Sequence, residues 1–403
     1  GTGSISILFF AFPYGQGTRL MAILSLAFNF LNIALFILFN ACTIARFTVD
    51  PGSLRDLLKH PNYSLFFGCY PMGATTILNV SVNVVYQYYG FGGKRFVYFL
   101  WALWWINITI SALCFWGGTH LMITRHSHSL STMTAAWILP VVTFVVASST
   151  GAVTADAVRV FSEHSALITL VVSAFLLTSG LLLASMMLAV YVLRLVVYGF
   201  PPGLSILSVF LPLGVSAQAG YSASLIGAEL RSLLPLTSSQ SPFFSMRLSG
   251  DAIHIFCSIT AFLLWSWAVL WITYALLGLV HILRRTRIQF KLTAWGLVFP
   301  NGVFANLTIR LAEVFDSGFF RVVGAIYSIL TFLLWCYVSY NTILMLPTLF
   351  QSQPVESGAY ENEKVEKGPP TSVHSRPSAI STAPSIDTAY ASQSIGLENT
   401  LIG

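Results

Sequence analysis

Long uncharged apolar stretches constrain this chain more than any other feature. Leu20–Ala45 and Thr260–Val280 contain no charged side chain, and each is long enough to cross a bilayer as a helix, which takes about 20 residues. Only 8% of the 403 residues are charged, far below the roughly 25% with which a soluble domain covers its surface. We therefore predict an all-α polytopic membrane protein. A soluble enzyme, a secreted disulfide scaffold and a nucleic-acid-binding domain are excluded.

Charged and turn residues divide the chain into ten apolar segments. We expect ten transmembrane helices arranged as five helical hairpins. The first segment reads as the second half of a helix whose first half is missing. The predicted segments are 1–12, 21–45, 64–89, 96–122, 133–153, 165–198, 203–228, 251–281, 292–312 and 322–347.

The chain divides into a transmembrane transporter domain, residues 1–350, and a polar tail, residues 351–403. The tail is rich in Ser, Thr and Pro, a composition that cannot bury enough apolar surface to fold, so we expect it to be disordered. Loops on the side of the tail hold more Lys and Arg than the opposite loops, chiefly through Arg284, Arg285, Arg287 and Lys291. By the positive-inside rule both termini are predicted to be cytoplasmic. The excess of basic residues fits anionic lipid headgroups and also an electropositive path for anions.

Proline recurs in every second predicted segment. It occupies the third, fifth, seventh and ninth segments as Pro71, Pro140, Pro212 and Pro300. Proline removes a backbone hydrogen bond and kinks a helix, and in a membrane the freed carbonyl needs cover from protein or from a water-filled cavity. We therefore predict five kinked inner helices around a central pore, with five unbroken helices outside. The predicted kink positions add the glycines Gly1, Gly3, Gly73, Gly214 and Gly302.

Small polar residues lie on the same segments as these prolines. As pore-lining residues we single out Asn79, Asn83, Ser148, Ser149, Ser216 and Asn301. The spacing of Arg310 and Glu313 favours a structural ion pair over a coupling site. The five cysteines fall inside apolar segments without a CxxC pair, and no nucleotide-binding loop is present. We expect a transporter rather than an enzyme, with no catalytic residue, no cofactor, no metal and no nucleic-acid partner.

Two stretches resemble the fungal sulfite efflux pumps, a branch of the tellurite-resistance/dicarboxylate transporter family that also holds the plant slow anion channels. They are HPNYSLFFGCYPMG at residues 60–73 and AWGLVFPNGVF at residues 294–304, and the resemblance extends over about residues 1–347. It implies efflux of sulfite or bisulfite across the fungal plasma membrane, one pore in each protomer, and small homo-oligomers, often trimers. It also implies that Phe299, directly before Pro300, blocks the pore.

Elementary physics permits this role for Phe299, because a bulky apolar ring can close a narrow water path. Ordinary helix packing is the alternative. An anion that leaves an inside-negative cell gains about 2.3 kcal/mol per charge per 100 mV, so efflux needs a gated route rather than ATP. Two other functions stay open. One is a C4-dicarboxylate (malate) permease or another anion channel of the same family. The other is a membrane enzyme or receptor, for which the sequence lacks a cluster of acids or histidines at membrane depth.

Overall fold

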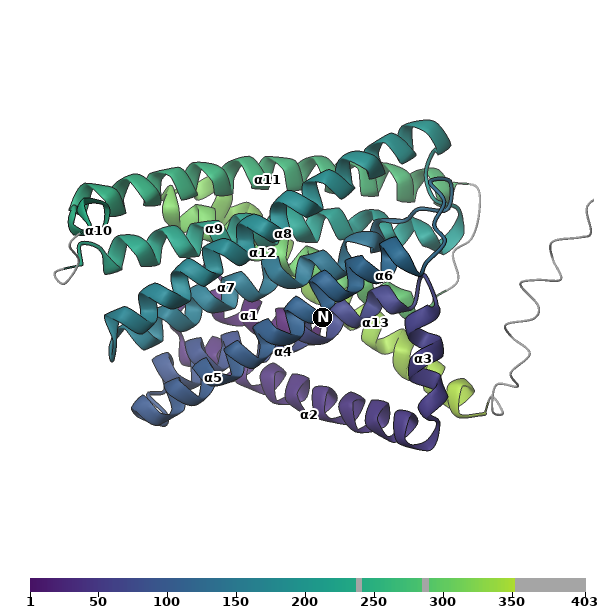
Figure 1. The fold of residues 1–403 in the computed structure, drawn as a ribbon, viewed down its shortest axis with the longest axis horizontal. Helices are drawn as coiled ribbons and strands as arrows, with labels where there is room; N and C mark the ends of the chain where they lie inside the picture. Colours follow the sequence, from purple (N-terminus) through teal and green to yellow (C-terminus); the bar gives the residue numbers. More distant parts are fainter. Residues whose placement is uncertain (237–240, 285–289, 352–403) are drawn as a thin grey trace, which may run out of the picture. The chain divides into compact units, whose positions relative to one another are not determined.

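The computed structural model describes residues 1–236, 241–284 and 290–351 (Figure 1). A compact unit comprises Gly1–Leu346. The second unit, Pro347–Gly403, is described only as far as Gln351. The predicted tail beyond that residue therefore lies outside the described part of the chain, as do Arg285 and Arg287 of the basic cluster. All regular structure in the described ranges is helical.

The described residues hold nine helical spans that are long and apolar enough to cross a membrane. A further apolar helix, α1 (Thr2–Ala11), is shorter. These ten segments match the predicted ones to within a few residues at each end, while the count of ten crossing helices stays a prediction. The nine spans are Arg19–Val49, Ser64–Tyr88, Gly93–Thr124, Ala135–Arg159, Glu163–Tyr198, Ser205–Leu233, Arg247–Leu283, Leu292–Val314 and Gly318–Pro347.

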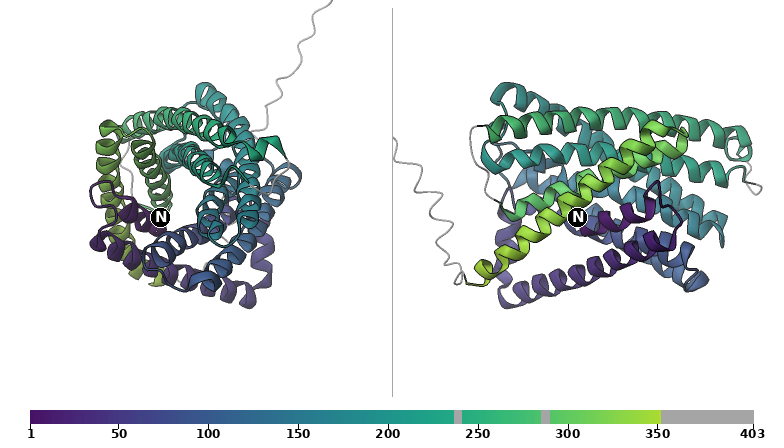
Figure 2. Two further views of the ribbon diagram at one scale, coloured as in Figure 1. Left: turned by 90° about the vertical axis from the view of Figure 1, so that its left-hand side faces the viewer. Right: turned by 180° about the vertical axis from the view of Figure 1, so that it is seen from behind.

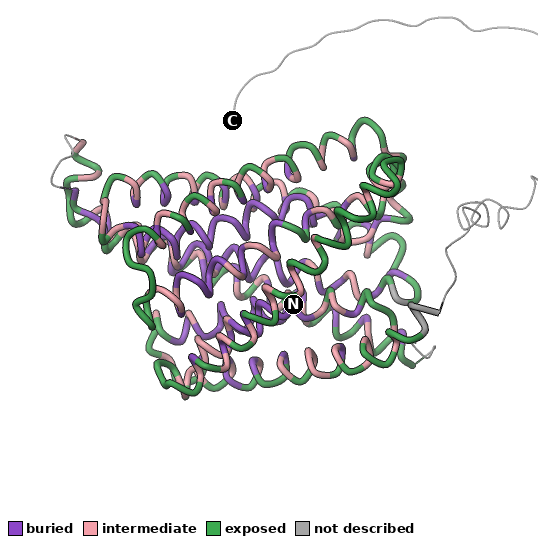
Figure 3. Tube along the Cα trace, turned by 90° about the horizontal axis from the view of Figure 1, so that it is seen from below, coloured by how far each residue is buried: buried purple, intermediate pink, exposed green. Residues whose placement is uncertain are grey.

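Burial alternates along these spans (Figure 3). The four spans built on α4 (Cys69–Val80), α7 (Leu139–Arg159), α9 (Leu211–Leu233) and α12 (Val298–Val314) are 61%, 100%, 78% and 67% buried. The other five spans are only 17–33% buried and expose many large apolar side chains, as a surface in contact with lipid requires. The predicted division into inner and outer helices is confirmed for these spans.

The inner helices form a closed ring. In the order α1, α4, α7, α9 and α12, each packs against the next, and α12 returns to contact α1. The left-hand view of Figure 2 looks along the bundle and shows inner helices surrounded by outer ones. Four outer helices pack against the inner helix that precedes them, which confirms these hairpins. They are α2 (Arg19–Val49), α5 (Gly93–Ala112), α8 (Glu163–Tyr198) and α11 (Arg247–Leu283).

Two short helices lie between the spans and were not predicted. In α3 (Pro51–Lys59), proline occupies the first position and the Asp50 carboxylate accepts a hydrogen bond from the Gly52 N–H at 3.1 Å. Both features favour the start of a helix. The second, α10 (Pro242–Ser245), is a single turn. The remaining long helix, α13 (Gly318–Gln351), is the last outer span.

Candidate functional site

The four recurring prolines lie where a 3₁₀ segment passes into an α-helix. Each is the second or third residue of its α-helix, and all four are buried. The N–H groups of a first α-helical turn have no partner four residues earlier, so the missing N–H of proline costs little there. The prolines therefore mark a change of helix type rather than a hydrogen bond lost in mid-helix, and their effect on a pore stays a prediction. The 3₁₀ segments are η1 (Ser64–Gly68), η4 (Ala135–Ile138), η5 (Gly203–Phe210) and η6 (Leu292–Leu297).

Two of the predicted kink glycines are points of close approach between inner helices. A Cβ atom on Gly3 of α1 would lie 2.1 Å from the hydroxyl oxygen of Thr76 on α4. A Cβ atom on Gly302 of α12 would lie 2.8 Å from the hydroxyl oxygen of Ser4 on α1. Neither glycine has a positive φ. Their visible role is to let α1 pack closely against both of its neighbours in the ring.

The other three predicted kink glycines are less constrained. A Cβ atom on Gly214 would lie 3.2 Å from the Cβ of Pro300, at the contact between α9 and α12. One on Gly1 would lie 3.2 Å from the Trp295 ring, and one on Gly73 would lie an ordinary 3.5 Å from the ring of Phe36 on α2. A kink at any of these positions stays a prediction.

The hydroxyls of all three predicted pore-lining serines make hydrogen bonds inside the ring of helices. The Ser148 and Ser222 hydroxyl oxygens are 2.5 Å apart, between α7 and α9. The Gln218 amide on α9 donates to the Ser149 hydroxyl on α7 at 2.6 Å. The Ser216 hydroxyl donates to the Pro212 carbonyl at 3.0 Å. These groups join neighbouring inner helices or close a helical turn.

Asn301 also makes hydrogen bonds within the protein. Its amide N–H donates to the Leu297 carbonyl at 2.7 Å, and its side-chain oxygen accepts from the Tyr327 hydroxyl on α13 at 2.5 Å. Tyr327 thus fixes the side chain two residues after Phe299. Asn301 therefore joins an inner helix to an outer one.

Other polar groups on the inner helices have no hydrogen-bond partner in the described part of the chain. The side-chain oxygens of Asn79, Thr150 and Asn306 are buried and unpaired, on α4, α7 and α12. Asn83 is half-buried in the π-helical segment η2 (Ser81–Tyr88) that continues α4. Asparagine offers both a donor and an acceptor. Among the predicted lining residues, Asn79 therefore has an unpaired side-chain oxygen, and the lining of a pore by Asn79 and Asn83 stays a prediction. Thr150 and Asn306 also have unpaired side-chain oxygens, and these two residues were not among the predicted lining residues.

Phe299 is the second residue of α12, at the junction with η6. It is half-buried and packs at the edge of the apolar cluster shared by the inner helices. Phe304, one turn further along α12, is buried and packs its ring against Trp265 and Tyr327. Within the described ranges Phe299 has no such ring partner. Phe299 is therefore held by apolar packing rather than by an aromatic pair, and its role as a gate stays a prediction.

The predicted ion pair is present, with Arg310 Nη1 2.8 Å from Glu313 Oε2. The five cysteines are free, and the described residues contain no group of three potential metal ligands.

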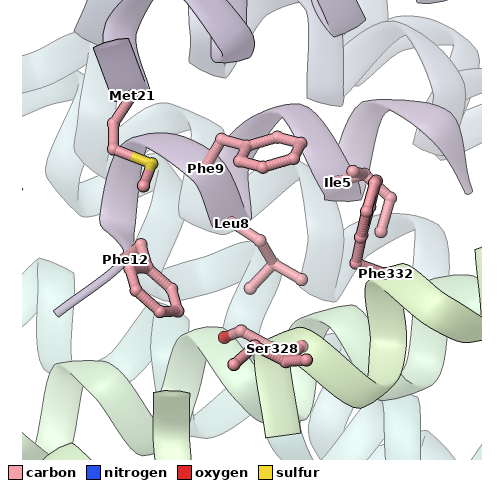
Figure 4. A pocket seen from close by; sticks show the side chains of 8 residues that line it. Ile5, Leu8, Phe9, Phe12, Met21, Ser328 and Phe332 are labelled. Atoms are coloured by element: carbon pink, nitrogen blue, oxygen red, sulfur yellow. The ribbon is translucent and has the colours of Figure 1, made fainter. Parts of the chain in front are cut away.

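A cavity of about 210 Å³ opens between α1, α2 and α13 (Figure 4). Its walls are apolar apart from Ser328, whose hydroxyl donates to the Gly324 carbonyl at 2.7 Å. A cavity without a free polar group cannot replace the hydration of an anion. This cavity is therefore not an anion site.

Comparison with known proteins agrees with this architecture. The family model described as voltage-dependent anion channel matches residues 1–343. The sulfite efflux pumps of Arthroderma benhamiae and Trichophyton rubrum are each 33% identical over 85% of this chain and 87% of their own length. The malic acid transport protein of Schizosaccharomyces pombe is 24% identical over 84% of this chain and 74% of its own length. The match covers the whole ring of inner helices, and the chain belongs to the voltage-dependent anion channel family.

Proposed function

We propose that this protein carries sulfite and bisulfite out of the cell across the fungal plasma membrane, along the axis of the inner ring. The observation that carries the proposal is the closed ring of α1, α4, α7, α9 and α12. Relatives named as sulfite efflux pumps align over 85% of the chain, and the family model covers residues 1–343, which include this whole ring. The predicted cytoplasmic termini and a small homo-oligomer, with one path in each protomer, belong to the same proposal.

The middle of the ring suits a weakly held anion. Its polar groups there are uncharged hydroxyls and amides. The side-chain oxygens of Asn79 and Asn306 are unpaired within the described residues, and each amide also carries N–H donors that suit an anion. Neutral donors bind an anion less tightly than fixed cations do, and conduction needs sites from which the ion can leave. The membrane potential drives an anion outward by about 2.3 kcal/mol per charge per 100 mV.

Phe299 is the proposed gate of this path. Its half-buried ring lies at the 3₁₀-to-α junction directly before Pro300. In the closed state the phenyl group of Phe299 fills the axis of the helix ring and excludes water. Rotation about the side-chain bonds of Phe299 opens the path. The Tyr327–Asn301 hydrogen bond holds the adjacent backbone in place.

Malate is the second candidate substrate, because the malic acid transport protein aligns over 84% of this chain. Cells that lack their own sulfite exporter distinguish the two. Expression of this chain should restore growth on sulfite and accelerate sulfite release. Malate uptake restored without a change in sulfite tolerance would refute sulfite as the substrate.

A further inference from the structure

The charged residues of the inner helices gather at one end of the ring. Helix α1 and the α4–η2 segment contain none. The other three inner helices carry theirs in their last turns, as Asp156 and Arg159 on α7, Glu229 and Arg231 on α9, and Arg310 and Glu313 on α12. An anion that moves along the ring toward these helix ends meets its first fixed charges there.

Side-chain contacts at this end join one inner helix to the next. In the loop after α1, the Gln16 amide donates to Glu313 at 3.1 Å. Glu313 pairs with Arg310 at 2.8 Å, and Arg310 Nε donates to the Ser224 hydroxyl on α9 at 3.3 Å. These contacts join α1 to α12 and α12 to α9.

Further contacts join α7 to η2 and η2 to the loop after α1. Arg159 pairs with Asp156 at 2.8 Å, and the Gln87 amide of η2 donates to Asp156 at 2.7 Å. The next residue of η2, Tyr88, donates its hydroxyl to the Gly17 carbonyl beside α1 at 3.5 Å. We call the whole set the mouth circuit: Gln16, Gln87, Tyr88, Asp156, Arg159, Ser224, Glu229, Arg310 and Glu313.

One link of the mouth circuit is open. Arg159 Nε and Glu229 Oε2 are 4.0 Å apart, too far for a hydrogen bond. Both atoms are buried, and neither has a hydrogen-bond partner among the described residues. Leaving a buried charged donor and acceptor unpaired is costly. An oxygen about 2.8 Å from each atom would bridge the gap, with an angle of about 90° at that oxygen between Arg159 Nε and Glu229 Oε2. That oxygen must accept from the arginine and donate to the carboxylate, so it must carry a proton, as the oxygen of water and that of a protonated oxyanion do.

We propose that this gap is the exit site of the path and that it binds a small oxyanion still carrying a proton. The inference rests on the proposed anion transport through the ring. Arg159 donates to the anion, Glu229 accepts its O–H, and Arg310 supplies the second cation of the mouth. With three carboxylates against two arginines, the circuit has no net positive charge, so the arginine donors can hold an anion without trapping it. The circuit also disfavours a dianion relative to a protonated monoanion such as bisulfite.

The test compares two anions, because nitrate has no proton to donate. The full chain is reconstituted into liposomes loaded with sulfite at pH 6, where bisulfite predominates, or with nitrate. The half-saturating concentration for release is measured, which does not depend on how much protein is folded. Arg159→Gln should raise it about tenfold for both anions. Glu229→Gln should raise it about fivefold for sulfite, since a charged acceptor binds about twice as strongly as a neutral one, and should not raise it for nitrate, which loses no hydrogen bond.

Arg231→Gln is the matched control. Arg231 lies at the same end of α9, but it pairs with Asp251 of α11 at 2.7 Å, outside the circuit; its loss should leave both concentrations unchanged. If liposomes that contain the wild-type protein released sulfite no faster than protein-free liposomes, the proposed function itself would be refuted. A different result would refute the exit site alone. In it the wild type releases sulfite, but Glu229→Gln changes the half-saturating concentrations of sulfite and nitrate equally or changes neither. The gap would then be occupied by water.

Discussion

Adding one methyl group to Gly3 tests whether the inner ring depends on close helix contacts. The Cβ atom of Gly3→Ala would lie 2.1 Å from Thr76 Oγ1 and 2.5 Å from Thr76 Cβ. Thr76 cannot turn away freely, because its hydroxyl donates to the Gly73 carbonyl at 2.8 Å and accepts from the Asn32 amide at 3.1 Å. The substitution must therefore push α1 away from α4.

The size of the effect follows from these contacts. Overpacking a tight contact costs about 1–3 kcal/mol, and breaking one of the two Thr76 hydrogen bonds adds about 1 kcal/mol. We expect Gly3→Ala to lower the free energy of unfolding by about 2–4 kcal/mol. Gly73→Ala is the matched control, since its Cβ would meet the Phe36 ring at an ordinary 3.5 Å. It should be neutral, or stabilising by about 0.5–1 kcal/mol through the helix propensity of alanine.

The assay is thermal unfolding of the purified protein in detergent. Unfolding is monitored as the loss of the monodisperse peak in size-exclusion chromatography after heating. Gly3→Ala should lose this peak at a lower temperature than the wild type, and Gly73→Ala should not. Release of sulfite at equal protein level should fall for Gly3→Ala alone. Equal melting temperatures for the two variants would show that the contact between α1 and α4 is not tight, and the reasoning would be wrong.

Two further predictions concern the hydroxyls and the prolines of the ring. Ser148→Ala should lower the unfolding free energy by about 1–3 kcal/mol, because it leaves the buried Ser222 hydroxyl unpaired. The double variant with Ser222→Ala should lose less stability than the sum of the two single variants. Strictly additive losses in the melting temperatures would contradict the hydrogen bond. Replacing a proline at a 3₁₀-to-α junction by alanine should lower sulfite release per surface molecule, because the junction is no longer fixed. The effect should exceed that of Pro202→Ala, since Pro202 is exposed in a loop. Equal release from all variants would remove the role of the junctions; the variants are Pro71→Ala, Pro140→Ala and Pro212→Ala.

Much of the fold is predictable from the sequence because lipid leaves few choices. A stretch such as Thr260–Val280 can only be a spanning helix, and the alternation of proline-bearing segments predicts which spans are buried. Arg310 and Glu313 could be paired from their spacing, since residues three apart share a helix face. Amphipathic α3 was missed because a hydropathy pattern detects spans and overlooks a short helix with Leu54 and Leu58 beside charged residues.

The detail of the site depends on contacts that spacing does not encode. The partner of Ser148 is Ser222, and the partner of Gln16 is Glu313, almost the whole chain away. Serines predicted to line the path therefore prove to be hydrogen-bonded, and the unpaired oxygens of Thr150 and Asn306 emerge only when their neighbours are known. Likewise Gly3 reads as a kink in the sequence, whereas the structure shows a contact.

Release of sulfite from cells or liposomes that contain Phe299→Ala tests the central claim most directly. Phe299 is half-buried, so its truncation should cost less than the about 3–5 kcal/mol of a fully buried Phe. Phe304→Ala is the control, because that ring is 4% exposed and packs against Tyr327 with centroids 4.8 Å apart. We predict normal protein levels and faster sulfite release for Phe299→Ala, and low protein levels for Phe304→Ala. Slower release per molecule from Phe299→Ala at normal protein level would contradict a path along the ring that this side chain closes.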